Sequence, residues 1–131
     1  MVVAHGSVYV DSGATALDNI DGDITAGIMT GGTVDTGHTG TYILTYDVTD
    51  IAGNPATQVT RSVTVVDMTA PSVTPAGGSF ITINQGTSYT ESGANWTDNV
   101  DGSGFLATPY TGSVDINTPG VYILQYSYTD G

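Results

Sequence analysis

Apolar and polar residues alternate along short runs of the chain. Two runs, TYILTYDVTD (41–50) and VYILQYSYTD (121–130), follow the two-residue period of a β-strand. One face of each run carries a row of aromatic and aliphatic side chains: Tyr42, Leu44, Tyr46 and Val48 in the first, and Tyr122, Leu124, Tyr126 and Tyr128 in the second. Such a row is typical of a strand with one face in the core. We therefore expect both tyrosine rows to be buried.

A third run, ATQVTRSVTVVD (56–67), alternates in the same way but places Arg61 in its apolar row, between Val59 and Val63. A guanidinium group there is costly unless a carboxylate pairs with it. We expect an ion pair or carbonyl contacts near the end of the sheet, with Asp18 or Asp50 as the partner. The alternative is a bulge or an extended side chain that carries the charge to water. Both interpretations make Arg61 structural.

The chain repeats itself with an offset of eighty residues. Residues 1–51 align with residues 81–131 without a gap, and the phrases ALDNIDGDIT and WTDNVDGSGF correspond. A fixed long period indicates stacked modules rather than one catalytic globule. The identical pairs include Gly13/Gly93, Asp18/Asp98, Asp21/Asp101, Asp35/Asp115, Tyr42/Tyr122, Tyr46/Tyr126 and Asp50/Asp130.

The runs between the turns predict an all-β fold. Thr, Val, Ile and Tyr stand in short stretches separated by Gly, Asn, Asp and Pro, which favours antiparallel strands. The Pro- and Gly-rich stretch MTAPSVTPAGGS (68–79) indicates an extended connection. We therefore expect tandem antiparallel β-sandwiches, one over residues 1–67 and the other over residues 68–131.

Several phrases in combination carry a family likeness. YVDSGATALDNIDGDIT, followed by GTYILTYDVTDIAGN and the Val-rich strand with Arg61, resembles the bacterial surface-protein immunoglobulin-like repeat. Similar repeats are attached to pesticidal crystal proteins and are related to hyalin-type repeats. The resemblance covers nearly the whole chain. It implies immunoglobulin-like sandwiches in a secreted or surface-attached protein, acting as spacer, stalk or adhesive module without catalysis.

The register of this resemblance matters. A full unit would run from a strand like PSVTPAGGSFITIN to one like ATQVTRSVTVVD, so repeat 1 (1–67) lacks its first strand and repeat 2 (68–131) lacks its last. One explanation is that the chain is a stretch of a longer repetitive protein. The other is that a neighbouring molecule supplies the strand by β-augmentation, which would build a head-to-tail fibre.

Composition excludes several classes of function. The chain has thirteen acidic residues, one Lys or Arg and a net charge of −12, so neither nucleic acid nor an anionic membrane surface is an expected partner. It has no cysteine, which excludes disulfides and thiolate metal sites. No apolar run is long enough to insert into a membrane. Low lysine with abundant Thr, Gly and Asp is typical of an extracellular or cell-surface protein.

The doubled acidic loops are candidate calcium sites. The spacing in DNIDGD does not fit an EF-hand, because Ile28 falls where the bidentate glutamate belongs. Carboxylates around a glycine turn, helped by the acid that ends each tyrosine run, would still suit a hard cation. The alternative is that Asp and Asn only cap tight turns. The candidate ligands are Asp18, Asp21, Asp23 and Asp50 in repeat 1, and Asp98, Asp101 and Asp130 in repeat 2.

Catalysis has little support in the sequence. Glu91 is the only glutamate, and His5 and His38 align with Gln85 and Thr118, which makes a shared histidine site unsupported. We expect no enzyme. For Trp96, a core position is favoured over an exposed platform for stacking sugars.

We therefore expect a non-catalytic structural or adhesive module, which calcium would stiffen if the acidic loops bind an ion rather than only cap turns. Its partners would be neighbouring repeats, copies of itself, glycans or surface proteins. Two alternatives stay open. One is an accessory carbohydrate-binding module of a secreted hydrolase, and the other is a fibre subunit assembled by strand exchange.

Overall fold

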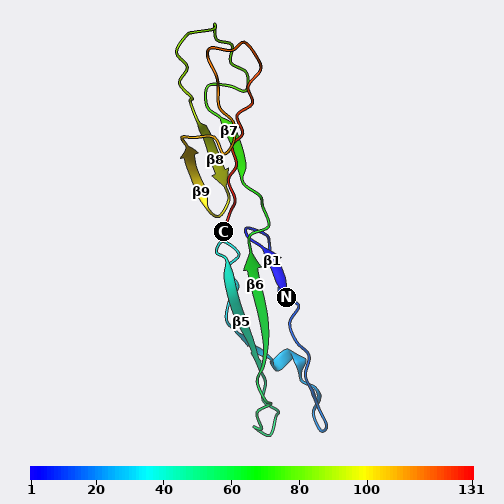
Figure 1. Cartoon of the computed structure of the whole chain (residues 1–131). Coiled ribbons are helices and arrows are strands. Elements are labelled where there is room, and N and C mark those ends of the chain that lie inside the picture. Colours follow the sequence, from blue (N-terminus) through cyan, green and yellow to red (C-terminus); the bar gives the residue numbers. More distant parts are fainter. The chain divides into compact units, whose positions relative to one another are not determined.

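The computed structural model describes residues 1–131. It consists of β-strands joined by turns, with one short 3-10 helix, η1 (Thr25–Gly27). The chain divides into two compact units, Met1–Met68 (unit 1) and Thr69–Gly131 (unit 2), as Figure 1 shows. The prediction of an all-β fold is confirmed.

Unit 1 is built on a four-stranded sheet in the order β1-β6-β5-β4. The long strands β5 (Gly40–Asp47) and β6 (Val59–Val66) form an antiparallel pair in which Leu44 lies opposite Arg61. Strand β4 (Met29–Gly31) extends the sheet antiparallel to β5, and β1 (Val2–Ala4) runs parallel to β6. The first and the last strand of the unit are therefore neighbours.

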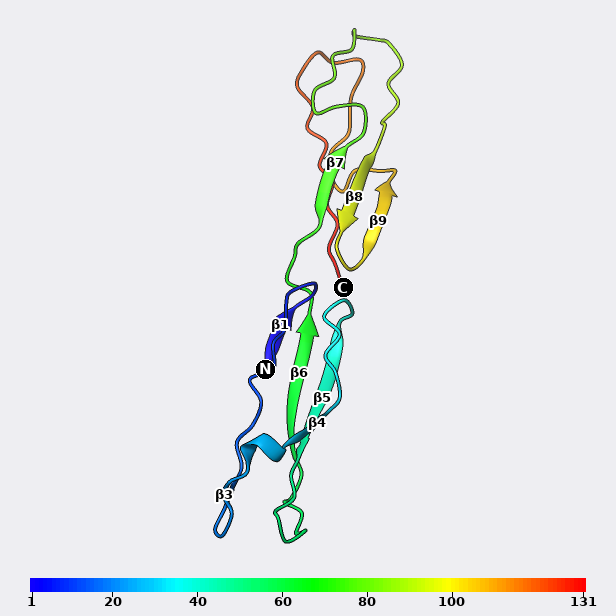
Figure 2. The same ribbon diagram turned by 180° about the vertical axis from the view of Figure 1, so that it is seen from behind.

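The segment after β1 forms the second layer of unit 1. It leads to the small hairpin of β2 (Leu17–Asp18) and β3 (Gly22–Asp23) and then to η1 (Figure 2). Between the layers lies the core, where Leu44, Tyr46 and Val48 are 4 to 8% exposed and Val63 is fully buried. The tyrosine row of repeat 1 is therefore buried, as expected, although Tyr42 at its end is only half-buried.

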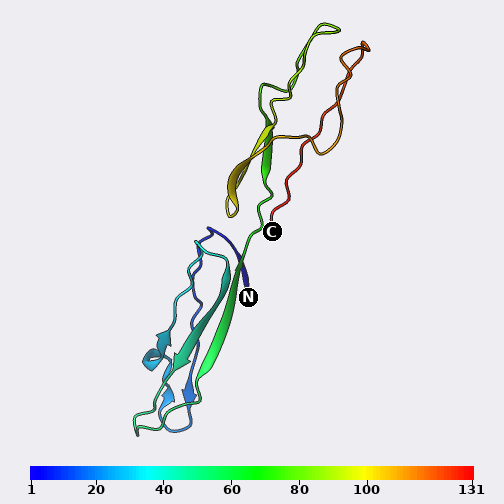
Figure 3. The same cartoon turned by 60° about the vertical axis from the view of Figure 1, so that its left-hand side comes forward.

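Unit 2 contains an antiparallel sheet of β7 (Ser72–Pro75), β8 (Ala94–Asp98) and β9 (Gly102–Leu106). The β8-β9 hairpin repeats the register of β2-β3, because Asp98 pairs with Gly102 as Asp18 pairs with Gly22. The C-terminal segment, red in Figure 3, runs opposite this sheet, and its Tyr128 ring stacks on Trp96 of β8. Since β7 belongs to the sheet, the stretch 68–79 is not simply the connection that its composition indicated.

The prediction for residues 121–130 is wrong in part. This run forms no extended strand and holds only an isolated bridge between Thr111 and Gln125. Leu124, Tyr126 and Tyr128 are half-buried, and Tyr122 is 36% exposed. The reason is the pairing: β5 of unit 1 lies between β4 and β6, whereas its equivalent in unit 2 has a bridge on one side only.

A glycine after β4 is required by the backbone of unit 1. Gly32 has a φ of +84°, and a Cβ there would come within 2.3 Å of the carbonyl oxygen of Ile43. We expect Gly32→Ala to lower the free energy of unfolding by about 1–3 kcal/mol or more, because strain and a backbone clash add. Gly27→Ala is the matched control, since its Cβ would make an ordinary 3.5 Å contact with Val48. Equal losses of thermal stability in the two variants would contradict this expectation.

Candidate functional site

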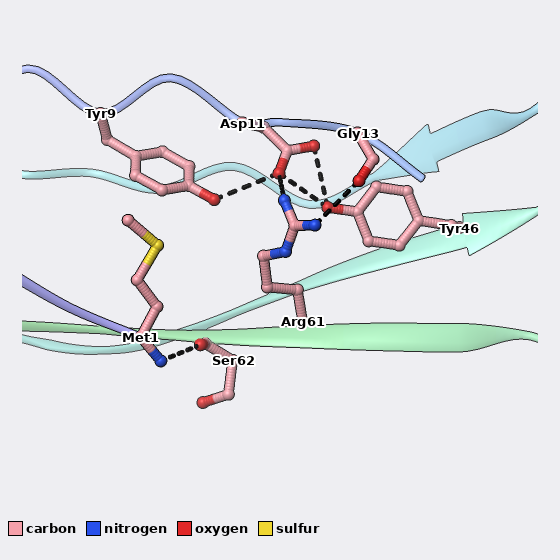
Figure 4. A network of polar contacts seen from close by, with 7 residues as sticks. All are labelled: Met1, Tyr9, Asp11, Gly13, Tyr46, Arg61 and Ser62. Atoms are coloured by element: carbon pink, nitrogen blue, oxygen red, sulfur yellow. Dashed lines mark hydrogen bonds and ion pairs between the residues drawn. The ribbon is translucent and has the colours of Figure 1, made fainter. Parts of the chain in front are cut away.

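Arg61 is the centre of a polar network between the two layers of unit 1 (Figure 4). Its guanidinium forms an ion pair with Asp11 and donates a hydrogen bond of 2.8 Å to the carbonyl oxygen of Gly13. The Tyr46 hydroxyl donates to the same carboxylate at 2.8 Å, and the Tyr9 hydroxyl lies 3.2 Å from it. The guanidinium carbon also lies 5.4 Å from the centre of the Tyr46 ring. Strand β6 is thereby joined to the opposite layer.

The network favours the ionised form of Asp11. Partial burial acts to raise the pKa of this carboxyl, but the Tyr46 hydroxyl and the charge of Arg61 outweigh burial, so the pKa lies below its ordinary value of 3.8. Burial and the neighbouring Asp11 raise the pKa of Tyr46, which keeps the phenol protonated and able to donate. These shifts indicate a neutralised structural pair rather than a reactive acid.

The predicted ion pair of Arg61 therefore exists, but both predicted partners are wrong. Arg61 pairs with Asp11 and not with Asp18 or Asp50. Asp50 instead accepts hydrogen bonds of 2.7 Å from the backbone and side-chain amides of Asn54. The physical reason is the layer geometry, since the segment that faces the middle of β6 is the one that carries Asp11 and Gly13.

The acidic loop of unit 1 is held by its own backbone. Asp18 accepts hydrogen bonds of 2.8 and 2.9 Å from the N–H groups of Ile20 and Asp21, and these bonds lower its pKa. Asp23 accepts a hydrogen bond of 2.9 Å from the Thr25 N–H group, and hydrogen bonding to Thr25 lowers the pKa of Asp23. Asp18 and Asp23 therefore cap turns of their own loop, as the alternative to calcium binding predicts.

The structure also brings the loop next to the Asp50 turn. The Asp21 carboxylate accepts a hydrogen bond of 2.9 Å from the Ile51 N–H group. Asp18 and Asp50 line one open groove of about 360 Å³, together with Leu17, Tyr46 and Val48. The negative charge of Asp50 acts to raise the pKa of Asp18, although the backbone bonds outweigh it. Asp23 makes its contacts within its own turn.

The equivalent acids of unit 2 lie around Tyr128. Asp98 accepts hydrogen bonds of 2.7 and 2.9 Å from the Val100 and Asp101 N–H groups, which repeats the turn of Asp18. The Tyr128 hydroxyl donates to Asp101 at 3.1 Å, and carboxylate oxygens of Asp98 and Asp130 lie within 4.8 Å of one another. Burial and then Asp101 raise the pKa of Tyr128.

Trp96 is a packing residue in this arrangement. Its ring stacks on Tyr128 with centroids 3.7 Å apart and an angle of 8° between planes. A Cβ on Gly104 would come within 2.6 Å of the indole, so the ring also lies against β9. Trp96 is half-buried in this arrangement, with Tyr128 covering one face of its ring.

A second acidic site in each unit escaped the sequence analysis. Asp11 aligns with Glu91 under the eighty-residue offset, and both precede a glycine by two residues and follow a tyrosine by two. In unit 2 the Tyr89 hydroxyl donates to Glu91, and the Gly93 N–H group donates to it at 3.1 Å. The signal was a shared acidic type rather than an identical residue, which counting identities alone overlooks.

Comparison with protein families identifies the chain. A family model described as bacterial surface protein, Ig-like domain, matches residues 1–65 and 73–131. The chain belongs to this bacterial surface Ig-like family. Modules of this family are typically non-catalytic and belong to proteins of the bacterial surface.

Other comparisons add little to this assignment. The lipoprotein BT2262 from Bacteroides thetaiotaomicron is 29% identical, with a TM-score of 0.45, over 57% of this chain. The match spans 40% of the length of that protein. No curated protein matches the chain. None of the helical segments is long and apolar enough to cross a membrane.

Proposed function

We propose that the chain is a load-bearing spacer in the extracellular part of a bacterial surface protein, made of two Ig-like repeats over residues 1–67 and 68–131. The observation that carries the proposal is the parallel pair of β1 and β6, the first and last strands of unit 1. A tension applied along the chain pulls these strands in opposite directions and loads their hydrogen bonds together. The bonds include His5 N–H to Val66 O and Thr64 N–H to Met1 O, both 2.8 Å.

Single-molecule stretching from residue 1 to residue 67 of the full chain tests this role. We expect one cooperative unfolding event of unit 1, and His5→Pro should lower its force because proline removes the N–H donor to Val66. His5→Ala is the matched control, because it keeps the backbone N–H donor and removes the ring, which contacts the Gly37 carbonyl oxygen at 2.9 Å. Unfolding forces that are unchanged by the proline would contradict the spacer role.

Calcium is a second part of the proposal. Asp18 and Asp50 face one groove, and the charge of Asp50 opposes ionisation of Asp18, so a cation between them would relieve repulsion. The ligands in unit 1 would be Asp18, Asp21, Asp23 and Asp50. Those in unit 2 would be Asp98, Asp101 and Asp130.

Thermal unfolding with calcium and with a chelator tests the ion. We expect calcium to raise the unfolding midpoint by a few degrees, because a ligand that binds only the folded state stabilises it. Asp50→Asn should remove the rise for unit 1, whereas Asp35→Asn should keep it, because Asp35 caps a different turn through the Gly37 N–H group. A midpoint that is the same in calcium and in chelator would remove calcium from the proposal.

A further inference from the structure

In unit 1, β6 occupies a defined position between two strands. It runs parallel to β1 on one side and antiparallel to β5 on the other. Its Arg61 enters a socket formed by Tyr9, Asp11, Gly13 and Tyr46. The position of β6 therefore has two requirements: a pair of flanking strands and an acidic socket that receives its arginine.

Unit 2 contains the same frame. The Gly86 N–H group donates to Ile116 O at 2.8 Å, as Gly6 donates to Thr36 O at 2.7 Å in unit 1. Gln85 Nε2 donates to Asn117 O at 2.7 Å, where His5 Nε2 contacts Gly37 O at 2.9 Å. The same contacts therefore fix the chain in both units next to the equivalents of β1 (residues 82–84) and of β5 (residues 120–127).

The position between these segments holds no strand of the described chain. Residues 82–84 belong to no strand, and the isolated bridge between Gln125 and Thr111 is the only β-pairing of residues 120–127. Apolar side chains of the two flanking segments are exposed: Ile83 is 37% exposed and Tyr122 36%. Leu124 is half-buried, whereas its equivalent Leu44 is 4% exposed.

The acidic socket of unit 2 is also built. Glu91 accepts hydrogen bonds from the Tyr89 hydroxyl and the Gly93 N–H group, and the Tyr126 hydroxyl is buried beside it. Burial, followed by the Glu91 carboxylate, raises the pKa of Tyr126 to about 12. These residues are the equivalents of the Asp11 socket. The only Lys or Arg of the chain is Arg61, which pairs with Asp11.

We propose that unit 2 binds an arginine-bearing β-strand from outside these 131 residues, with the arginine on Glu91. The strand lies parallel to residues 82–84 and antiparallel to residues 120–127, as β6 does in unit 1. Valines on either side of the arginine cover the row of Leu124 and Tyr122. The negative charge of the chain, −12, favours a basic segment over an acidic one.

Binding of a synthetic peptide tests the proposal. The peptide ATQVTRSVTVVD, residues 56–67 of the chain itself, is added with a fluorescent label to the full chain, and anisotropy is measured. We expect saturable binding that is at least about tenfold weaker for Glu91→Gln, because a hydrogen-bonded charge pair is lost. A peptide in which methionine replaces Arg61 should bind the wild-type chain with a similarly reduced affinity. Asp115→Asn is the control, because it removes one negative charge from unit 2 outside the socket. Asp115 accepts a hydrogen bond from the Asn117 N–H group in its own turn, so this variant should bind the peptide as the wild type does.

A tethered strand provides the second measurement. Residues 52–67 are copied after Gly131, which places the copied arginine eighty residues after Arg61. We expect a higher unfolding midpoint of unit 2, followed by fluorescence of its Trp96, and loss of the gain when the copied arginine is replaced by methionine. Self-association of the chain that the free peptide reverses would also support the proposal, because a second copy would then supply the strand that unit 2 binds. The proposal is overturned if neither peptide nor tether acts, or if both act independently of the arginine and of Glu91.

Discussion

Leu44→Ala is expected to lower the free energy of unfolding of unit 1 by about 2–5 kcal/mol. Leu44 is 4% exposed, lies opposite Arg61 on β6 and packs in the row that contains Tyr46 and Val48. Removing its side chain forfeits the burial and leaves a cavity that the paired strands β5 and β6 cannot easily close. Because small domains are marginally stable, a loss of this size populates the unfolded unit. Hydrogen exchange of the β5 and β6 amides measures it.

Leu124→Ala in unit 2 is the matched control for this loss. Leu124 is the equivalent of Leu44, but it is half-buried, so the same truncation should cost less than half as much. Trp96 is the only tryptophan of the chain and lies in unit 2, so its fluorescence follows unit 2 separately. Equal losses for the two leucines would contradict the difference in burial. A tethered strand that unit 2 binds should raise the cost of Leu124→Ala toward that of Leu44→Ala.

The alternating pattern was sufficient to predict the centre of unit 1. The faces of β5 and β6 were predicted from a two-residue period, and the side chains on the predicted inner face, Leu44, Tyr46 and Val63, are buried. The same pattern at residues 121–130 predicted a strand that the structure does not form, although the residue types are nearly the same. A pattern shows which side chains would share a face, but a strand also needs a neighbouring segment to pair with along its length, and the pairing of distant segments is not encoded in the period.

The partner of Arg61 illustrates the same limit for the site. Its place in an apolar row was sufficient to predict an ion pair, because a partly buried guanidinium needs a counter-charge. The choice of Asp18 or Asp50 was wrong, because the segment that crosses β6 in the opposite layer is set by the fold and not by spacing. The useful signal was the replacement of Asp11 by Glu91 eighty residues later, which keeps the charge at an equivalent position.

Arg61→Met is expected to lower the unfolding midpoint of unit 1 by several degrees. The substitution keeps most of the apolar stem but leaves the half-buried Asp11 carboxylate, 24% exposed, without its cation and the Gly13 carbonyl without its donor. Arg61→Lys should be intermediate, since a lysine restores the charge but not the two-pronged contact with Asp11 and Gly13. The double variant Arg61→Met with Asp11→Asn should lose less than the sum of the single variants, because no unpaired carboxylate remains.

The pH dependence separates this ion pair from simple packing. The folded pKa of Asp11 lies below its ordinary value of 3.8, so its contribution to stability is fully present above that pH and is lost as the pH falls through the folded pKa. Without Arg61, the Tyr46 hydrogen bond remains but the charge that helps it to oppose burial is lost, so the folded pKa of Asp11 rises. The stability difference between the wild type and Arg61→Met should therefore shrink as acid is added. A difference that is constant from neutral pH down to the acid transition would assign the loss to contacts other than the ion pair, such as packing and the bond to the Gly13 carbonyl, because only the ionised carboxylate depends on the cation.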